Sequence, residues 1–151
     1  MKPPAAALLD DLGVEYRLIR LRGQAVTVQD VLDNSEGDVS REEICKTIIV
    51  KGAEGERYAI FLKGSDRISF SKLKPSVGKV SVVSHDEVLE TAGAEPGAVC
   101  PLTLKIPVYL DERVLRLKRI NFGSGDHLYG IEMRTADLAR ALSFKVLDLA
   151  E

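Results

Sequence analysis

The sequence predicts an α+β domain, with a mixed, mainly antiparallel sheet or partly closed barrel and helices on its flanks. Strand-like segments outnumber helix-like segments, and several strands join through tight turns, which suit antiparallel neighbours better than long crossovers do. No internal repeat, linker or low-complexity segment interrupts the 151 residues. We therefore expect one domain, residues 1–151, with a sizeable core.

Near the start of the chain the signals are those of a helix, a strand and a second short helix. A proline at its start and Gly13 beyond its end predict a helix over residues 4–12. Residues 14–21 follow as a strand, and Thr27 is a suitable N-cap for a helix that ends near Leu32.

The next part of the chain is predicted to hold a hairpin between two helical turns. Ser40 and Glu43 have the spacing of a capping box, which opens a helical turn before the apolar strand 47–50. The strand 58–62 is its expected partner across a glycine-containing turn, and one helical turn follows at 69–73.

The second half of the chain alternates short strands and helices. A strand at 79–83 precedes a second capping box, Ser84 with Glu87, so a helix is expected from there to Gly93. The remaining segments are expected to be strands at 106–110 and 115–122, a turn at 123–126, a strand at 128–133, a helix from Thr135 or Asp137 to Leu142, and a closing segment at 144–149.

Composition excludes several protein classes. Hydrophobic residues make up 45% and charged residues 29% of the chain, which is typical of a globular, water-soluble domain. The start lacks the apolar core of a signal peptide, and no run reaches membrane-spanning length. Two cysteines give neither a disulfide framework nor a zinc-ligand spacing, so we expect a cytoplasmic protein without metal or cofactor. The scarcity of asparagine and glutamine beside many charged residues hints at a thermophile.

The net charge of −2 argues against a protein that coats nucleic acid through bulk electrostatics. A site for one end of an RNA needs only a local basic face, and two segments are candidates for it. One holds Arg17, Arg20 and Arg22, and the other holds Arg113, Arg116, Lys118 and Arg119. Each cluster taken alone fits an ordinary solvated strand face better.

The most informative segment is the connection between the helix that ends at Gly93 and the next strand. It reads Gly93-Ala94-Glu95-Pro96-Gly97-Ala98-Val99-Cys100-Pro101-Leu102. Its two glycines allow positive φ or a close approach to a ligand, and its two prolines fix φ and remove two amide donors. Loops of this length are usually functional or disordered, and the apolar residues of this one argue for an anchored binding loop.

Lys46 is the leading candidate for chemistry. It stands where the expected helical turn meets an apolar strand, and an ammonium group there can bind a phosphate or polarise a carbonyl. Its position alone favours an ordinary surface lysine at a strand end. The combination of Lys46 with the glycine loop changes that balance.

These features together resemble one family. The run Cys45–Val50 is similar to the lysine–threonine–apolar segment of the YbaK/EbsC family, the prolyl-tRNA synthetase-associated editing domain. The loop 93–101 is similar to the GxxxGxxxP loop of that family, and residues 108–112 and 122–128 resemble the segments that follow. The resemblance runs in order from about residue 43 to residue 149 and implies a YbaK-like fold.

The resemblance implies a hydrolase that deacylates mischarged aminoacyl-tRNA in trans, often proline tRNA that carries alanine or cysteine. It implies that Lys46 is the residue most tied to activity and anchors the aminoacyl-adenosine end. The substrate-binding residues that it implies are Thr47, Gly93, Pro96, Gly97, Ala98, Cys100, Pro101, Gly123, Ser124 and His127. The expected partners are the acceptor end of an aminoacyl-tRNA and a prolyl-tRNA synthetase, and a homodimer is left open.

The expected mechanism is substrate-assisted, because the sequence offers no evident serine–histidine–acid set. In that mechanism a free ribose hydroxyl of the terminal adenosine orients or activates the attacking water, or the thiolate of a cysteinyl substrate attacks instead. Backbone N–H groups around Gly97 and Ala98 are expected to hold the carbonyl oxygen or a phosphate.

Three further residues have two interpretations each. Cys100 is a pocket residue or a nucleophile in one interpretation and a small buried hydrophobe in the other, which is the more common case. His127 is a candidate acid or base without an identified partner. Gly123, with its neighbours, lines the pocket by resemblance, whereas the residues alone indicate a turn between strands.

Two other functions fit the sequence. The same pocket could bind a nucleotide, an amino acid or a tRNA end without hydrolysis, and the lack of a triad favours that alternative. A regulatory or assembly protein with a vestigial cleft is the third. The editing hypothesis depends on whether the Lys46 amine faces the 93–101 loop.

Overall fold

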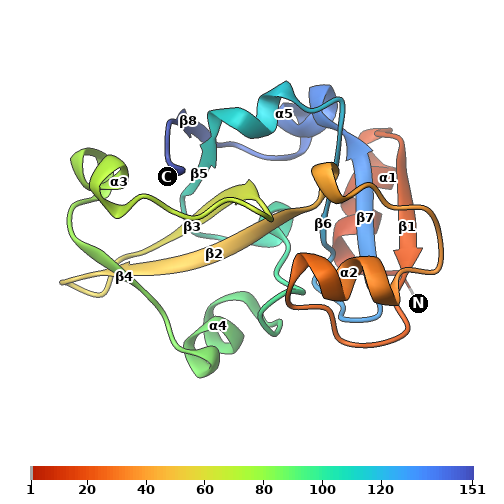
Figure 1. Ribbon diagram of the computed structural model, residues 1–151, viewed down its shortest axis with the longest axis horizontal. Coiled ribbons are helices and arrows are strands. Elements are labelled where there is room, and N and C mark those ends of the chain that lie inside the picture. The colour runs from red at the N-terminus through yellow and green to blue at the C-terminus, as the bar shows by residue number, and fades with distance from the viewer. Residues whose placement is uncertain (1) are drawn as a thin grey trace.

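The computed structural model describes residues 2–151 as strands and helices in two sheets (Figure 1). The strands are β1 (Tyr16–Arg20), β2 (Cys45–Gly52), β3 (Arg57–Lys63), β4 (Val80–Val82), β5 (Val108–Asp111), β6 (Arg119–Gly123), β7 (Tyr129–Arg134) and β8 (Lys145–Leu147). The α-helices are α1 (Pro4–Leu12), α2 (Val28–Asn34), α3 (Phe70–Val77), α4 (His85–Ala92) and α5 (Leu138–Ala141). The 3-10 helices are η1 (Arg41–Glu43), η2 (Pro101–Thr103), η3 (Glu112–Arg116) and η4 (Thr135–Asp137). None of the described helices is long and apolar enough to cross a membrane.

One sheet is antiparallel and the other is mixed. The first has the strand order β1-β7-β6, and the second has the order β4-β2-β3-β5-β8. In the second sheet β2 pairs antiparallel with β3 and β4, whereas β5 pairs parallel with β3 and β8. The strands of the two sheets run crosswise in Figure 1, and a bridge between Ile44 and Asn121 joins them. The predicted α+β class, a mixed sheet arrangement with flanking helices, is confirmed.

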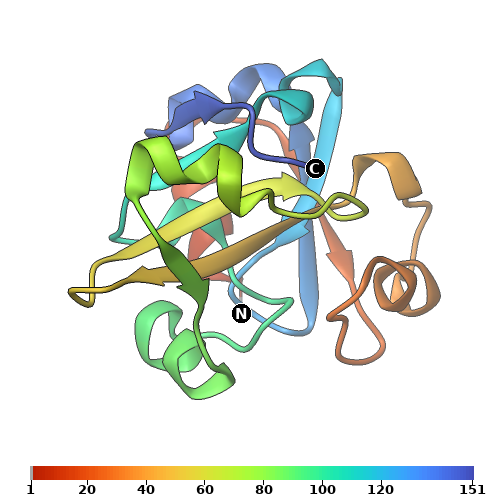
Figure 2. The same ribbon diagram turned by 60° about the vertical axis from the view of Figure 1, so that its left-hand side comes forward.

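The core explains why β3 is an uninterrupted apolar run. Ala59 and Phe61 belong to the cluster that fills the space between the two sheets, with α1 packed against it. Ile60 and Leu62 belong to a second cluster, which includes Leu73 of α3. Because alternate residues of a strand point to opposite faces, β3 is buried on both sides. Figures 1 and 2 show α3 and α4 on opposite sides of the β2–β3 hairpin.

Several predicted boundaries are confirmed. Helix α1 spans the predicted range and ends at Gly13, whose φ is 67°. Thr27 caps α2 by accepting a hydrogen bond from the Asp30 amide, and Ser84 caps α4 in the same way from Glu87. The β2–β3 hairpin forms in the expected place, with Lys46 opposite Leu62.

Other local predictions are wrong. Ser40 makes no capping hydrogen bond, and η1 is a single 3-10 turn, because the Glu43 carboxylate faces Arg119 at 3.5 Å instead of the backbone. Leu115 lies in η3 and not in a strand, since the Asp111 side chain accepts from the Arg113 amide and starts a turn there. The single turn expected at 69–73 is a longer helix, α3, which continues through its internal proline.

Candidate functional site

A cleft of about 620 Å³ opens between β2, α2, α4 and the 93–101 loop. We call it the main cleft. Lys46 and Thr47 line it from β2, and Pro96 and Gly97 line it from the loop. The side chain that the sequence singled out therefore shares one cavity with the glycine loop. A volume of this size is in the range of small-molecule sites, roughly 300–1,000 Å³.

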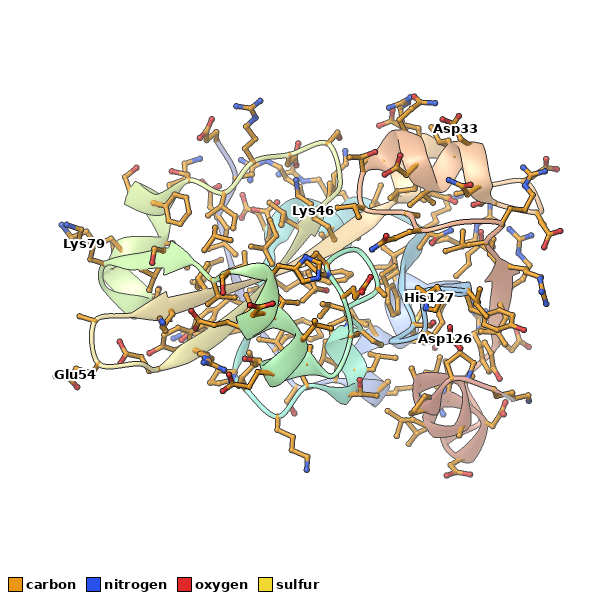
Figure 3. The ribbon with its side chains drawn as sticks, turned by 90° about the horizontal axis from the view of Figure 1, so that it is seen from below. Asp33, Lys46, Glu54, Lys79, Asp126 and His127 are labelled. Atoms are coloured by element: carbon orange, nitrogen blue, oxygen red, sulfur yellow. The ribbon has the colours of Figure 1, made fainter. Side chains whose placement is uncertain are left out.

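Lys46 is half-buried at the start of β2, and its ammonium group donates a hydrogen bond to the Gly64 carbonyl oxygen at 3.1 Å. Burial lowers the pKa of Lys46 below 10.5, and the nearby Asp66 carboxylate partly offsets this effect. Figure 3 shows Lys46 near the middle of the molecule, close to the side of α2 and far from the hairpin tip that carries Glu54. The amine is thus a cation with a fixed position and free N–H donors.

Two glycines are required where the loop passes its neighbours. Gly97 has a φ of 90°, and a Cβ atom there would overlap the carbonyl oxygen of Ala25. A Cβ atom at Gly123 would lie 2.7 Å from the Val99 oxygen and the Ala98 carbonyl carbon. The loop is therefore clamped between the Ala25 segment and the end of β6, and both positions tolerate only glycine.

The backbone amides of the loop differ in what they can do. The Ala98 amide donates to the Glu95 carbonyl oxygen at 3.0 Å, so it is already used in a turn. The Gly97 amide has no hydrogen-bond partner within residues 2–151. The expectation that both amides could hold an oxyanion is corrected, because only that of Gly97 has its donor free.

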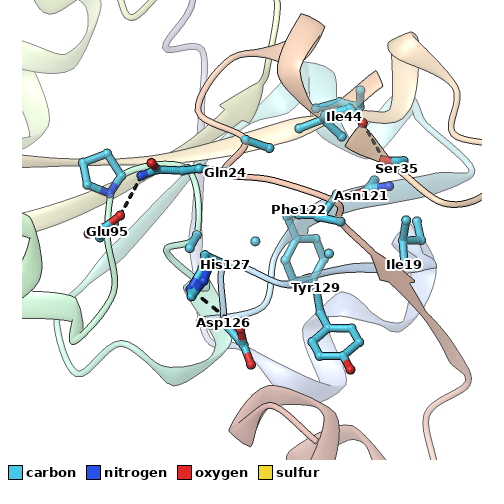
Figure 4. Close-up of a pocket in the computed structure, with 18 of the residues that line it drawn as sticks. Ile19, Gln24, Ser35, Ile44, Glu95, Asn121, Phe122, Asp126, His127 and Tyr129 are labelled. Carbon is cyan, nitrogen blue, oxygen red and sulfur yellow. Dashed lines mark hydrogen bonds and ion pairs between the residues drawn. The ribbon is translucent and has the colours of Figure 1, made fainter. Parts of the chain in front are cut away.

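A smaller cavity of about 30 Å³ adjoins the main cleft, and we call it the side pocket. The two cavities share Ala25, Val31, Ile44, Cys45, Pro96, Gly97 and Gly123 in their walls. Figure 4 shows the side pocket with Ile19 and Phe122 on its apolar side. Gln24 donates a hydrogen bond to Glu95 at 2.6 Å and so joins the two loops beside it.

His127 and Ser124 lie on the β6–β7 turn but differ in access. His127 lines the side pocket, its side chain is 63% exposed, and Nδ1 lies 4.0 Å from the Asp126 carboxylate. Ser124 is fully buried, and its hydroxyl donates to the Tyr129 carbonyl oxygen at 2.7 Å while it accepts from the Asp126 amide. That hydroxyl holds the turn in shape and borders neither cavity.

Three other residues implied by the resemblance also lie outside both linings. Gly93 ends α4 with a φ of 67°, and Cys100 and Pro101 are buried at the other end of the loop. Burial raises the pKa of the Cys100 thiol to about 12, and the same cause raises that of Cys45 to about 12. Neither thiol is a thiolate at neutral pH, so both have the inert character of small buried hydrophobes.

Asn121 is the site residue that sequence reasoning missed. Its side chain is 3% exposed in the wall of the side pocket, and the amide nitrogen has no hydrogen-bond partner within residues 2–151. The Thr47 hydroxyl in the main cleft is likewise buried without a partner. Buried polar groups without partners are rare, and each requires an explanation. The signal in the sequence was a single asparagine between Ile120 and Phe122 in a predicted strand.

Comparison with known proteins identifies the family. Residues 23–141 match the aminoacyl-tRNA editing domain. The chain belongs to this family. It is 32% identical over 91 residues to the proline–tRNA ligase of Staphylococcus aureus strain Newman, and the match covers 58% of the chain and 16% of that ligase. The editing-domain chain thus corresponds to a small part of these curated relatives.

Solved structures of the same fold cover the whole editing domain. The crystal structure of the hypothetical protein APE2540 has a TM-score of 0.84 and 28% identity, over 97% of this chain and 98% of that one. A candidate trans-editing enzyme for prolyl-tRNA synthetase has a TM-score of 0.82 and 22% identity, over 100% of this chain and 99% of that one. The suspected YbaK-like membership and fold are therefore confirmed.

Proposed function

We propose that this protein hydrolyses the ester bond between a small amino acid and the terminal adenosine of a mischarged tRNA. The single observation that carries the proposal is the meeting of Lys46 and Gly97 in one cleft, in a chain of the aminoacyl-tRNA editing family. The ligase relatives are specific for proline by name, so proline tRNA is the tRNA that we propose as substrate.

In this proposal the main cleft holds the adenosine and the side pocket holds the amino-acid side chain. The ammonium group of Lys46 keeps free N–H donors beyond its bond to Gly64, and it anchors the phosphate or ribose end of the adenosine. The free amide of Gly97 lies at the junction of the two cavities, where it can donate to the ester carbonyl oxygen.

The reaction needs positioning and charge stabilisation more than a protein nucleophile. Water attacks the ester carbonyl carbon, the bond to the ribose oxygen breaks, and the released ribose oxygen takes the proton that the water loses and becomes a hydroxyl group. The neighbouring free ribose hydroxyl orients that water in our proposal. The raised pKa of Cys100 and of Cys45 argues against a covalent thioester on the protein.

The size of the side pocket limits the amino acid. A volume of about 30 Å³ accepts only a few atoms, since a single water needs roughly 10–15 Å³ by the same kind of measure. Alanine and cysteine fit this limit. The Asn121 amide on the pocket wall gives a polar contact for the bound aminoacyl group.

A panel of aminoacyl-tRNAs tests the proposal. Each tRNA carries a radiolabelled amino acid, and both retained complex and released amino acid are measured with time. We expect fast release from alanyl- or cysteinyl-tRNA for proline and slow release from the cognate prolyl-tRNA. Saturable retention without release would instead establish a binding module, and neither retention nor release would leave a non-catalytic assembly role.

A further inference from the structure

The outer face of the three-stranded sheet connects the side pocket to a second groove. In the β6–β7 pairing, Gly123 lies opposite Gly130 at one end, and Arg119 lies opposite Arg134 at the other. Both pairs lie on the same face of the sheet, because every second residue of a strand lies on one face. The glycine pair lines the side pocket. At about 3.4 Å per residue, the arginine pair lies roughly 14 Å away along the strands.

The arginine pair lines an open groove of about 610 Å³, which we call the basic groove. Its lining consists of Glu43, Leu115, Leu117, Lys118, Arg119, Arg134, Thr135 and Ala136. Three of these residues are cationic and one is anionic. Lys118 and Arg119 belong to one of the two basic segments visible in the sequence, which the proposed chemistry of the main cleft does not use.

The charges at the groove are layered. Arg119 contacts Glu43 at 3.5 Å, and the two side chains are 57% and 17% exposed. Arg119 also lies 3.9 Å from the Glu132 carboxylate, whose side chain is 10% exposed. Arg134 contacts Asp137 at 3.3 Å, with 62% and 14% exposed. The carboxylates therefore lie beneath and the guanidinium groups face the solvent. Each guanidinium has five N–H donors, so these carboxylate contacts leave donors for an anion.

Two further features favour an anionic ligand for the groove. Like charges directly opposite each other on antiparallel strands destabilise the pairing, and Arg119 and Arg134 have that arrangement. The Thr135 side chain is 6% exposed in the groove wall, and its hydroxyl has no partner within residues 2–151. Lys118 is exposed and makes no ion pair with any described residue. A phosphate in the groove would offset the repulsion and give these groups a partner.

We propose that the basic groove binds the phosphodiester backbone of the tRNA acceptor arm while the 3′ end occupies the main cleft. This inference rests on the proposed function for its choice of RNA. The net charge of −2 makes non-specific attraction weak, so a local cationic surface is needed to hold a polyanion. The groove and the side pocket lie on one sheet face, so one RNA strand can reach both.

Binding of uncharged tRNA tests the groove without any catalysis. Fluorescence anisotropy of a labelled tRNA is measured across a salt series for wild type and for Lys118→Glu. Lys79→Glu is the matched control, because Lys79 is also exposed and its replacement makes the same change of charge. Figure 3 shows Lys79 on the opposite side of the molecule from His127, which lies on the β6–β7 turn. We expect Kd to rise about tenfold, and the slope of log K against log salt to fall by about one, for Lys118→Glu only.

A second variant separates binding from folding. Thr135→Val keeps the side-chain shape and removes the unpartnered hydroxyl, so we expect an unchanged or higher Tm together with weaker tRNA binding. The groove is excluded as an RNA site if both groove variants bind tRNA as the Lys79→Glu control does. The proposal would also be overturned if the groove variants bound tRNA as tightly as wild type does but lost binding of an acidic protein.

Kinetics separate this inference from the proposed function. With full-length aminoacyl-tRNA, we expect Lys118→Glu to raise KM several-fold with little change in kcat. With a minimal aminoacyl-adenosine ester, which is too short to reach the groove, both parameters should match wild type. A wild-type protein without hydrolysis would refute the deacylase proposal, while the anisotropy series would still decide the groove.

Discussion

The Lys46 ammonium nitrogen lies 3.1 Å from the Gly64 carbonyl oxygen, so the loop after β3 fixes a cation of β2 that lines the main cleft together with the glycine loop. This contact uses one of three ammonium donors. The remaining donors are what the editing proposal requires of Lys46.

The Gly97 position tests whether the loop must approach its neighbour closely. Gly97→Ala adds backbone strain at a φ of 90° and an overlap with Ala25. Gly13→Ala is the matched control, because Gly13 also has positive φ, at 67°, but nothing lies within 4 Å of an added Cβ atom. Strain of about 1–3 kcal/mol should lower the Tm of both variants. Only Gly97→Ala should lose binding of an aminoacyl-adenosine analogue in calorimetry, and normal binding would make the loop merely structural.

The buried thiols are predicted to be inert. Because burial raises the pKa of Cys45 and of Cys100 to about 12, the folded protein should resist iodoacetamide at pH 8, as read by mass spectrometry. Protein unfolded in guanidinium provides the control and should be alkylated at both sites. Cys100→Ala should deacylate at the wild-type rate. A large loss of kcat in that variant would restore Cys100 as a nucleophile.

We predict that Asn121 contributes to binding of the aminoacyl group and does not stabilise the fold. Asn121→Leu replaces an unpartnered buried amide with an apolar side chain of similar size, so the Tm should stay constant or rise by a few degrees. Deacylation of the preferred aminoacyl-tRNA should fall at least severalfold. Thermal melts and initial rates measure the two effects, and an unstable variant with full activity would contradict the assignment.

The pH dependence of binding follows from Lys46. Its pKa lies below 10.5 in the fold, so the ammonium loses its proton at a lower pH than a free lysine does. Affinity for a non-hydrolysable aminoacyl-adenosine should therefore be complete near neutral pH and decline on the alkaline side before pH 10.5 is reached. Lys46→Arg stays charged and should lose this alkaline limb. An identical limb in both proteins would assign the titration to another group.

The same shift has a consequence for stability. A lysine whose folded pKa is lowered resists protonation in the fold, so its charged form costs stability below the folded pKa, and that cost disappears above the unfolded pKa. Lys46→Met should therefore be at least as stable as wild type at neutral pH. This separates a loss of activity from a loss of fold.

The sequence predicted the elements whose signals are local. The proline–glycine pair of α1, the Thr27 cap of α2 and the alternation in the β2–β3 hairpin all depend on neighbours in the chain. The sequence-based predictions were wrong where contacts between residues distant in the chain determine the local structure. Glu43 turns to Arg119 instead of closing a capping box with Ser40, and that contact exists only after β6 is in place.

The candidate site was predictable to the same extent. Lys46 and the glycine loop stood out by residue type and spacing, and the fold places them in one cleft. The same loop and the β6–β7 turn also contain residues that line neither cavity, namely Cys100, Pro101 and Ser124. Their burial depends on how the loop and the turn pack against the sheets, which the sequence does not show. Asn121 was missed because its lack of a partner is a property of the folded core and leaves only a faint trace in the sequence.

The most direct test of the account is the rate of deacylation of mischarged proline tRNA by Lys46→Met, beside Lys79→Met as a control. Lys79 is an exposed lysine far from the main cleft, so its loss should leave the rate unchanged. We expect Lys46→Met to lose at least tenfold in kcat/KM, about 1.4 kcal/mol or more of transition-state stabilisation, with an unchanged Tm. Equal rates for wild type and both variants would contradict the account.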